Sequence, residues 1–239
     1  MGRSPWMNVE IWSDVVCPWC YIGKRRFEAA LAGFEHRDEV AVTWRSFQLD
    51  PTAPTTAQGD PLDRLVAKYG MSRADAERAQ ARVTANAATV GLDFHLDRAR
   101  SGNTSDAHRL LHYALTAGKQ QDLKERLMAG YFVDGEAVGE PEVLARLATE
   151  VGLDEPAVRA VLESDDFAEE VRQDEQDARR LGITGVPFFV VDRAYGVSGA
   201  QPPELIRSTL EQAWVDSHPL TMVPIGGDDA SCTDESCIR

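Results

Sequence analysis

Two cysteines near the N-terminus, Cys17 and Cys20, are the residues of this sequence best suited to chemistry. They enclose Pro18 and Trp19, follow a β-type run and precede a helix-type run. This order places the first sulfur at a helix N-terminus, where unpaired N–H groups and the helix dipole favour a thiolate. We therefore expect Cys17 to attack disulfides and Cys20 to resolve the mixed disulfide. Pro18 suits the first helical turn, and we expect Pro18 and Trp19 to tune geometry and access.

Two other interpretations of this motif stay open. The cysteine pair resembles half of a zinc site, which needs further Cys or His ligands. The remaining cysteines, Cys232 and Cys237, are separated by four residues, a spacing that fits a tight zinc knuckle poorly. A zinc knuckle also has no need for Pro and Trp between its ligands. The second alternative is a pair of buried, unreactive cysteines.

A second signal lies far downstream, around Val186 and Pro187. Residues 181–191 read as a helix end, a loop and a buried strand, with Pro187 at the strand entry. A proline is tolerated there if its missing donor faces away from the sheet. An ordinary trans proline that begins a strand explains the same pattern.

The composition limits the classes of partner. The 239 residues carry a net charge of −14, which argues against nucleic acid or an anionic membrane as a partner. No run of apolar residues is long enough to span a membrane, and residues 1–7 lack the apolar core of a signal peptide. We therefore expect a cytoplasmic protein, in which disulfides are usually transient and catalytic.

The order of the expected elements defines the fold. Strands at 8–16 and 39–49 flank the first helix, and a strand pair with a final helix follows Pro187. The segment between these halves is helical, and its expected helices cover 62–69, 72–90, 105–117, 121–132, segments opening at 140 and 155, and 164–181. This order predicts an α/β thioredoxin fold interrupted by an all-helical insertion. We assign 8–60 with 183–218 to the thioredoxin-fold domain, 61–182 to the inserted domain and 219–239 to a mobile tail.

Four short segments of the chain carry a resemblance to a known family, both in their residues and in their order along the sequence. They are residues 13–23 around the cysteines, 103–109 (Asn-Thr-Ser-Asp-Ala-His-Arg), 185–189 (Gly-Val-Pro-Phe-Phe) and 196–201 (Gly-Val-Ser-Gly-Ala-Gln). In this combination the chain resembles the DsbA-type thioredoxin superfamily, specifically its FrnE-like branch, from about residue 8 to 217. The resemblance implies dithiol–disulfide exchange on protein or small-molecule thiols. It also implies a cis Val186–Pro187 bond that faces the cysteines and offers its backbone to the substrate.

The same superfamily includes relatives that use glutathione. They are the 2-hydroxychromene-2-carboxylate isomerases and kappa-class glutathione transferases, which usually carry a single catalytic Ser or Cys. The presence of both Cys17 and Cys20 favours redox chemistry, with no cofactor beyond the redox-active disulfide and with glutathione as a candidate co-substrate. A glutathione-dependent isomerase or transferase for small aromatic compounds is the alternative function. A chaperone or a metal-binding module is the third. The sequence does not distinguish a monomer from a homodimer.

Further residues enter through this resemblance. In the family the helix after residue 103 lies close to the active site, so Asn103 and His108 are candidates for the pocket. His108 and His112 also share a helix face, but no third ligand completes a metal site. Lys24 and the two arginines after it are expected on a solvated face.

The family also includes proteins with a distal cysteine pair, which Cys232 and Cys237 match. Acidic residues surround these two cysteines and disfavour their thiolates. We expect the pair either to relay electrons to or from Cys17 and Cys20, or to be exposed thiols that oxidise incidentally.

Overall fold

A four-stranded mixed sheet organises the computed structural model, which describes residues 6–55 and 59–219. The strand order is β2-β1-β3-β4, with β1 parallel to β2 and antiparallel to β3, and β3 antiparallel to β4. The strands are β1 (Met7–Ser13), β2 (Val40–Ser46), β3 (Phe188–Val191) and β4 (Tyr195–Ser198). Nearly every residue of β1 is buried, because this strand lies inside the sheet with helices on both faces.

Helices account for most of the remaining chain. They are α1 (Pro18–Ala32), α2 (Pro61–Tyr69), α3 (Arg73–Ala88), α4 (Ser105–Thr116), α5 (Gln120–Ala129), α6 (Pro141–Glu150), α7 (Glu155–Glu163), α8 (Ala168–Arg180) and α9 (Pro203–Ser217), with a short 3-10 turn at Arg37–Glu39 and a π turn at Gly130–Asp134. Proline in the first turn begins five of them, where its missing N–H has no helical partner to lose.

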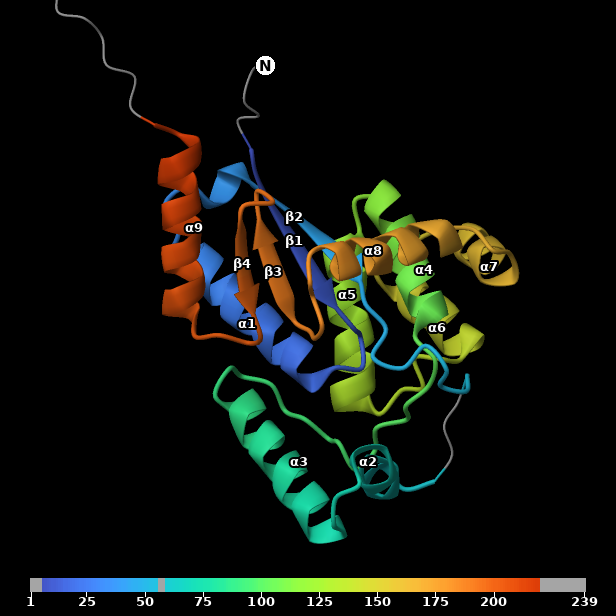
Figure 1. The fold of residues 1–239 in the computed structure, drawn as a ribbon. Coiled ribbons are helices and arrows are strands. Elements are labelled where there is room, and N and C mark those ends of the chain that lie inside the picture. Colours follow the sequence, from blue (N-terminus) through green and yellow to red (C-terminus); the bar gives the residue numbers. More distant parts are fainter. Residues whose placement is uncertain (1–5, 56–58, 220–239) are drawn as a thin grey trace, which may run out of the picture.

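Helices α1 and α9 pack on one face of the sheet (Figure 1). Alternate residues of β1 point to this face, so Val9 and Ile11 meet Phe27 of α1 and Leu210 of α9 in one apolar cluster. The face opposite is covered by α8, whose Ala178 packs against Trp12. Phe27 and Ala30 thus anchor the second half of α1, the helix that begins at the cysteine motif, on this face of the sheet.

Helix α5 docks on the edge strand β2. The Gln120 side chain accepts a hydrogen bond from Trp44 N and donates one to Trp44 O, both at 2.9 Å. A side-chain amide thus satisfies backbone groups that an edge strand would otherwise leave open. This contact brings the α5 side chains beneath the end of β1.

The helical segment has a core of its own, which extends into the motif. Helices α4 to α7 supply most of its buried apolar residues, and Val15, Cys17, Cys20 and Tyr21 belong to the same cluster. The two halves of the fold therefore share packing at the cysteines. The domain boundaries at residues 60 and 182 stay a prediction.

The structure confirms the expected fold, a thioredoxin fold with inserted helices, and corrects several boundaries. The first two strands end at Ser13 and Ser46, three residues early, because each is followed by a turn or loop. The helix expected over 164–181 begins only at Ala168, since Phe167 has a φ of 63°. The helix expected over 121–132 leaves α geometry at Gly130.

Some expectations fall outside the described residues. These are most of the N-terminal stretch considered as a signal peptide, part of the loop before α2, and the tail with Cys232 and Cys237. Among the helices of the described chain, none combines the length and apolarity needed to cross a bilayer.

Candidate active site

The cysteine motif lies at the start of α1, as the sequence predicts. Strand β1 ends at Ser13, a short turn follows, and Cys17 is the N-cap of the helix with Pro18 in the first turn. The Cys17 carbonyl accepts from Cys20 N at 3.0 Å and from Tyr21 N at 3.3 Å. Both sulfurs therefore lie within the first turn, one at the cap and one inside the helix.

The two thiols differ in exposure. Cys17 is 4% exposed and Cys20 is fully buried, while Trp19 between them is 36% exposed. Burial raises the pKa of Cys20 well above 9.0, and the neighbouring Cys17 raises it further, whereas Lys124 and Ser13 act in the opposite direction. Only Cys17 retains access to solvent, as a nucleophile requires, and Cys20 is held as a thiol behind it.

The Val186–Pro187 segment meets the motif from the other half of the chain. The bond between these residues is cis, and the Cys17 thiol donates to Val186 O with a sulfur–oxygen distance of 3.7 Å. Pro187 O accepts from Gly199 N at 2.8 Å, which ties this loop to the end of β4. The sequence-predicted Cys17, Cys20, Val186 and Pro187 are thus brought together.

Gly23 allows this close approach. A Cβ atom at Gly23 would lie 2.8 Å from Pro187 Cγ and 3.5 Å from Ala200 Cβ. No real Cβ atom tolerates the shorter distance, so α1 packs against the Pro187 ring only because residue 23 is glycine.

His108 lies behind the motif rather than in an open pocket. It is 1% exposed, and its Nε2 lies 3.4 Å from Oδ1 of the equally buried Asp14. Burial alone would raise the pKa of Asp14. The hydrogen bond and charge of His108, the N–H of Leu49 and the charge of Lys124 outweigh burial and lower it. His108 therefore helps to keep a buried carboxylate beside the turn that leads to Cys17.

His112 has a separate carboxylate partner. Its Nε2 lies 2.9 Å from Asp174 Oδ2 and 3.1 Å from Ser46 Oγ, on the side of α4 that faces α8. Within residues 6–55 and 59–219, no group of three or more His, Cys, Asp or Glu side chains could hold a metal ion. The two histidines thus share a helix face but contact different carboxylates, Asp14 for His108 and Asp174 for His112.

Asn103 fastens a loop. Its side-chain amide donates to Pro51 O at 3.0 Å and to Ala53 O at 3.2 Å, and its Oδ1 accepts from Ser105 N at 2.8 Å. These bonds join the loop after β2 to the first turn of α4.

Replacing Asn103 with alanine is expected to lower the free energy of unfolding by about 1–2 kcal/mol, because its three hydrogen bonds to backbone groups are lost. If Asn103 acts only on the loop, KM for a disulfide peptide changes less than twofold. Denaturant unfolding and steady-state kinetics measure both. A large rise in KM with unchanged stability would instead place Asn103 in the substrate pocket.

The expectation of a solvated face at Lys24 is wrong. Lys24 is 4% exposed, and its Nζ lies 2.5 Å from both Glu28 and Glu125. Glu125, on α5, also accepts from Tyr21 Oη at 2.6 Å and pairs with Arg25. Lys24 is one helical turn after Cys20, so its side chain faces α5. The sequence does not reveal this burial, because a charged residue normally indicates an exposed position.

Replacing Glu125 with glutamine is expected to destabilise the protein by about 1–2 kcal/mol, between the values typical of exposed and buried ion pairs. Burial raises the pKa of Glu125, but hydrogen bonds from Lys24, Tyr21 and Arg25 outweigh it and hold the pKa below 4.5. The stabilisation is therefore full above pH 4.5 and is lost as the pH falls through the lower, folded-state pKa. Urea unfolding from pH 7 to pH 3 measures it.

As a control, Glu169→Gln removes an exposed carboxylate whose ion-pair partner in the described part of the chain is Arg172. It should leave the unfolding free energy within about 0.5 kcal/mol of wild type. If Glu125→Gln were as stable as this control at pH 7, the network would not hold α1 on α5.

The sequence reasoning missed Lys124. It lies on α5 with its side chain fully buried, and its Nζ donates to Ser13 O at 3.3 Å. The signal was present, because position 124 falls on the helix face that also carries the buried Gln120, Leu127 and Met128. A charged residue on the buried face of a helix is expected to have either a buried partner or a function.

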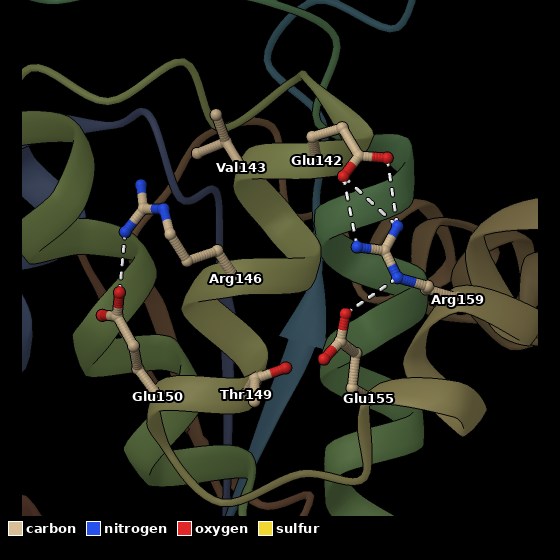
Figure 2. A pocket seen from close by; sticks show the side chains of 7 residues that line it. All are labelled: Glu142, Val143, Arg146, Thr149, Glu150, Glu155 and Arg159. Atoms are coloured by element: carbon tan, nitrogen blue, oxygen red, sulfur yellow. Dashed lines mark hydrogen bonds and ion pairs between the residues drawn. The ribbon is translucent and has the colours of Figure 1, made fainter.

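A surface depression between α6 and α7 is not part of this site (Figure 2). Charged side chains line it and pair with one another. Arg159 binds Glu142 and Glu155, each at 3.0 Å, and Arg146 lies 2.7 Å from Glu150. It contains no residue that the sequence singled out for chemistry.

Comparison with known proteins identifies the family. The model of the DSBA-like thioredoxin domain matches residues 8–211. A probable DsbA oxidoreductase from Streptomyces coelicolor is 48% identical, with a TM-score of 0.85 over 93% of this chain and 97% of its own. The uncharacterized protein YwbO of Bacillus subtilis is 27% identical over 77% of this chain and 86% of its own.

DsbM of Pseudomonas aeruginosa, a cytosolic disulfide reductase, shares the fold at 19% identity. Its TM-score is 0.61 over 87% of this chain and 98% of its own. The family match covers the cysteine motif, the inserted helices and the proline loop in a single stretch. The chain therefore belongs to the DSBA-like thioredoxin domain family.

Proposed function

We propose that this disulfide oxidoreductase exchanges disulfides of proteins and small thiols through Cys17 and Cys20. The observation that carries the proposal is the contact between Cys17 Sγ and Val186 O, across 169 residues of sequence and beside Pro187. It supports a nucleophilic sulfur placed next to backbone that a substrate strand can join.

The first step is attack by the Cys17 thiolate on a substrate disulfide. A bond forms between Cys17 Sγ and one substrate sulfur, the substrate S–S bond breaks, and the other sulfur leaves as a thiolate that takes up a proton. The extended substrate pairs with the backbone at Val186 as an added strand. Trp19, the exposed residue of the motif, contacts the substrate beside the sulfur.

The second step is resolution by Cys20. Its thiol loses a proton, and the thiolate attacks Cys17 Sγ. The Cys17–Cys20 disulfide forms while the second substrate sulfur leaves with its electron pair and takes up a proton. Two electrons pass from the enzyme dithiol to the substrate. Run in reverse, the same steps oxidise a substrate dithiol.

The co-substrate and location are parts of the same proposal. Glutathione is the small thiol proposed to return the enzyme to its dithiol form, and the cytoplasm is the proposed compartment. The cytoplasm is proposed because disulfides there are usually transient and catalytic, as they are in this exchange, and the chemistry of the exchange supports a thiol reductant.

The test is reduction of insulin disulfides by dithiothreitol with and without the protein. The proposal predicts that catalytic amounts of the wild type accelerate reduction. No acceleration, together with turnover of a small aromatic substrate that requires glutathione, would replace this proposal with the isomerase alternative.

The double variant Cys232→Ser, Cys237→Ser, assayed in parallel, tests the proposed electron relay from the tail. Unchanged rates with dithiothreitol and glutathione alike would exclude that relay.

A further inference from the structure

Lys124 is the buried charged group that the exchange steps above do not use. Its side chain is fully buried between α5 and the sheet. Besides the hydrogen bond to Ser13 O at 3.3 Å, its Nζ lies 5.4 Å from the centre of the Trp44 ring. It thus reaches the end of β1, immediately before the turn that leads to Cys17.

Among the described residues, no carboxylate lies within ion-pair distance of Lys124 Nζ, whereas Lys24 has two such partners at 2.5 Å. A buried ammonium without a counter-ion costs folding free energy. Burial accordingly lowers the pKa of Lys124 to about 8, so that the side chain gains and loses its proton close to neutral pH.

The surroundings of this amine lead to Cys20. The Ser13 hydroxyl is buried, has no hydrogen-bond partner among the described residues, and lies close enough to Cys20 to lower its pKa. The titratable groups that act on Lys124 are Cys20, Asp14, Cys17 and Lys24. Asp14 is bound to His108 and Leu49 N, and Lys24 is bound to Glu28 and Glu125. Cys20 is therefore the neighbouring acid that has to ionise for resolution, and Lys124 is the cation that acts on its pKa.

We propose that Lys124 is a positioning residue for resolution, and that its buried ammonium stabilises the thiolate of Cys20 as this sulfur attacks the mixed disulfide on Cys17. The inference rests on the proposed function. The balance of the step is unchanged: the Cys20 proton leaves, the Cys17–Cys20 bond forms, and the Cys17–substrate bond breaks. Lys124 keeps its own proton and supplies only the positive charge.

The charge is needed because Cys20 is otherwise hard to ionise. Full burial and the nearby Cys17 both raise its pKa, and Lys124 acts against them. A nearby cation lowers the pKa of an acid by roughly 1–3 units. Removal of the charge should therefore slow resolution about tenfold or more at a fixed pH below 8.

The test is a single-turnover reaction of the reduced protein with 5,5′-dithiobis(2-nitrobenzoate) in a stopped-flow spectrometer. Attack by Cys17 releases the first thionitrobenzoate at a rate proportional to reagent concentration. Resolution by Cys20 releases the second at a rate independent of it. The Cys232→Ser, Cys237→Ser background leaves only the motif cysteines to react. Lys124→Met removes the charge at similar size, and Lys124→Arg keeps it. Lys119→Met is the control at the exposed lysine that forms the N-cap of the same helix.

The proposal predicts that Lys124→Met leaves the first phase within about twofold and slows the second about tenfold or more. The pH midpoint of the second phase should rise by about one unit or more, and Lys124→Arg should restore both. An unchanged second phase and pH profile in folded Lys124→Met would overturn the inference. If that variant does not fold, the pH dependence of the second phase in the wild type decides. Lys124 loses its charge near pH 8, so the rate of this phase should rise less steeply with pH above that value. A profile without that change would also overturn the inference. Absence of the first phase in wild type would contradict the proposed function itself.

Discussion

Cys17→Ser is expected to abolish disulfide reduction, leaving only the rate of the reductant alone. Serine has nearly the same size but supplies no thiolate at neutral pH, so the attack on the substrate disulfide cannot begin. Cys20→Ser should behave differently. It retains the attacking sulfur and therefore should form mixed disulfides that it cannot resolve internally. Insulin reduction, followed by turbidity with each variant at equal concentration, measures the first effect.

The matched serine variants make this prediction specific. Cys17→Ser and Cys20→Ser remove one sulfur each from the same turn of α1, so a purely structural effect would be similar in both. The fold of each variant is checked by its thermal unfolding. Residual catalysis by Cys17→Ser that exceeds that of Cys20→Ser would reverse the proposed roles.

Gly23→Ala is expected to cost about 1–3 kcal/mol of unfolding free energy, the usual range for overpacking a well-packed core. The added methyl would lie 2.8 Å from Pro187 Cγ, so α1 or the proline loop has to move. Movement of the loop would take Val186 away from Cys17 and should lower kcat/KM about tenfold or more, as small displacements of reacting groups do. Denaturant unfolding and insulin reduction measure the two effects.

The control lies on the same helix. Gly33, the C-cap of α1, would place an added Cβ no closer than 3.5 Å to any neighbour, and its φ of −91° suits any residue. Gly33→Ala should therefore stay within about 0.5 kcal/mol of wild type and keep full activity. Equal stability and activity of both variants would mean that the packing of Pro187 on α1 does not position the site.

The parts of the site that could be predicted depend on local signals. The position of Cys17 follows from the strand before it, the Pro between the two cysteines and the helix after them, because neighbouring residues determine where a helix starts. The hairpin of β3 and β4 and the entry of Pro187 into β3 follow in the same way. The meeting of Val186 with Cys17 came instead from the family resemblance, since 169 residues separate them.

The parts that were missed depend on distant packing. Lys24 and Lys124 carry charges that normally indicate a surface, and only the docking of α5 against α1 and the sheet buries them. Asn103 fits a pocket or a loop equally well in sequence, and its partners lie 50 and 52 residues away. The start of α8 was misplaced because Phe167 takes a left-handed conformation for which its residue type gives no cue.

In the proposed reaction, Cys17 is the sulfur that attacks the substrate. This role is tested by the reaction of full-length Cys20→Ser with a disulfide-bonded peptide, followed by acid quenching, proteolysis and mass spectrometry of the adduct. We expect one peptide attached through a disulfide to Cys17, and none when Cys17 is also serine. A peptide attached mainly to Cys232 or Cys237, or formation of the adduct in the absence of Cys17, would contradict it.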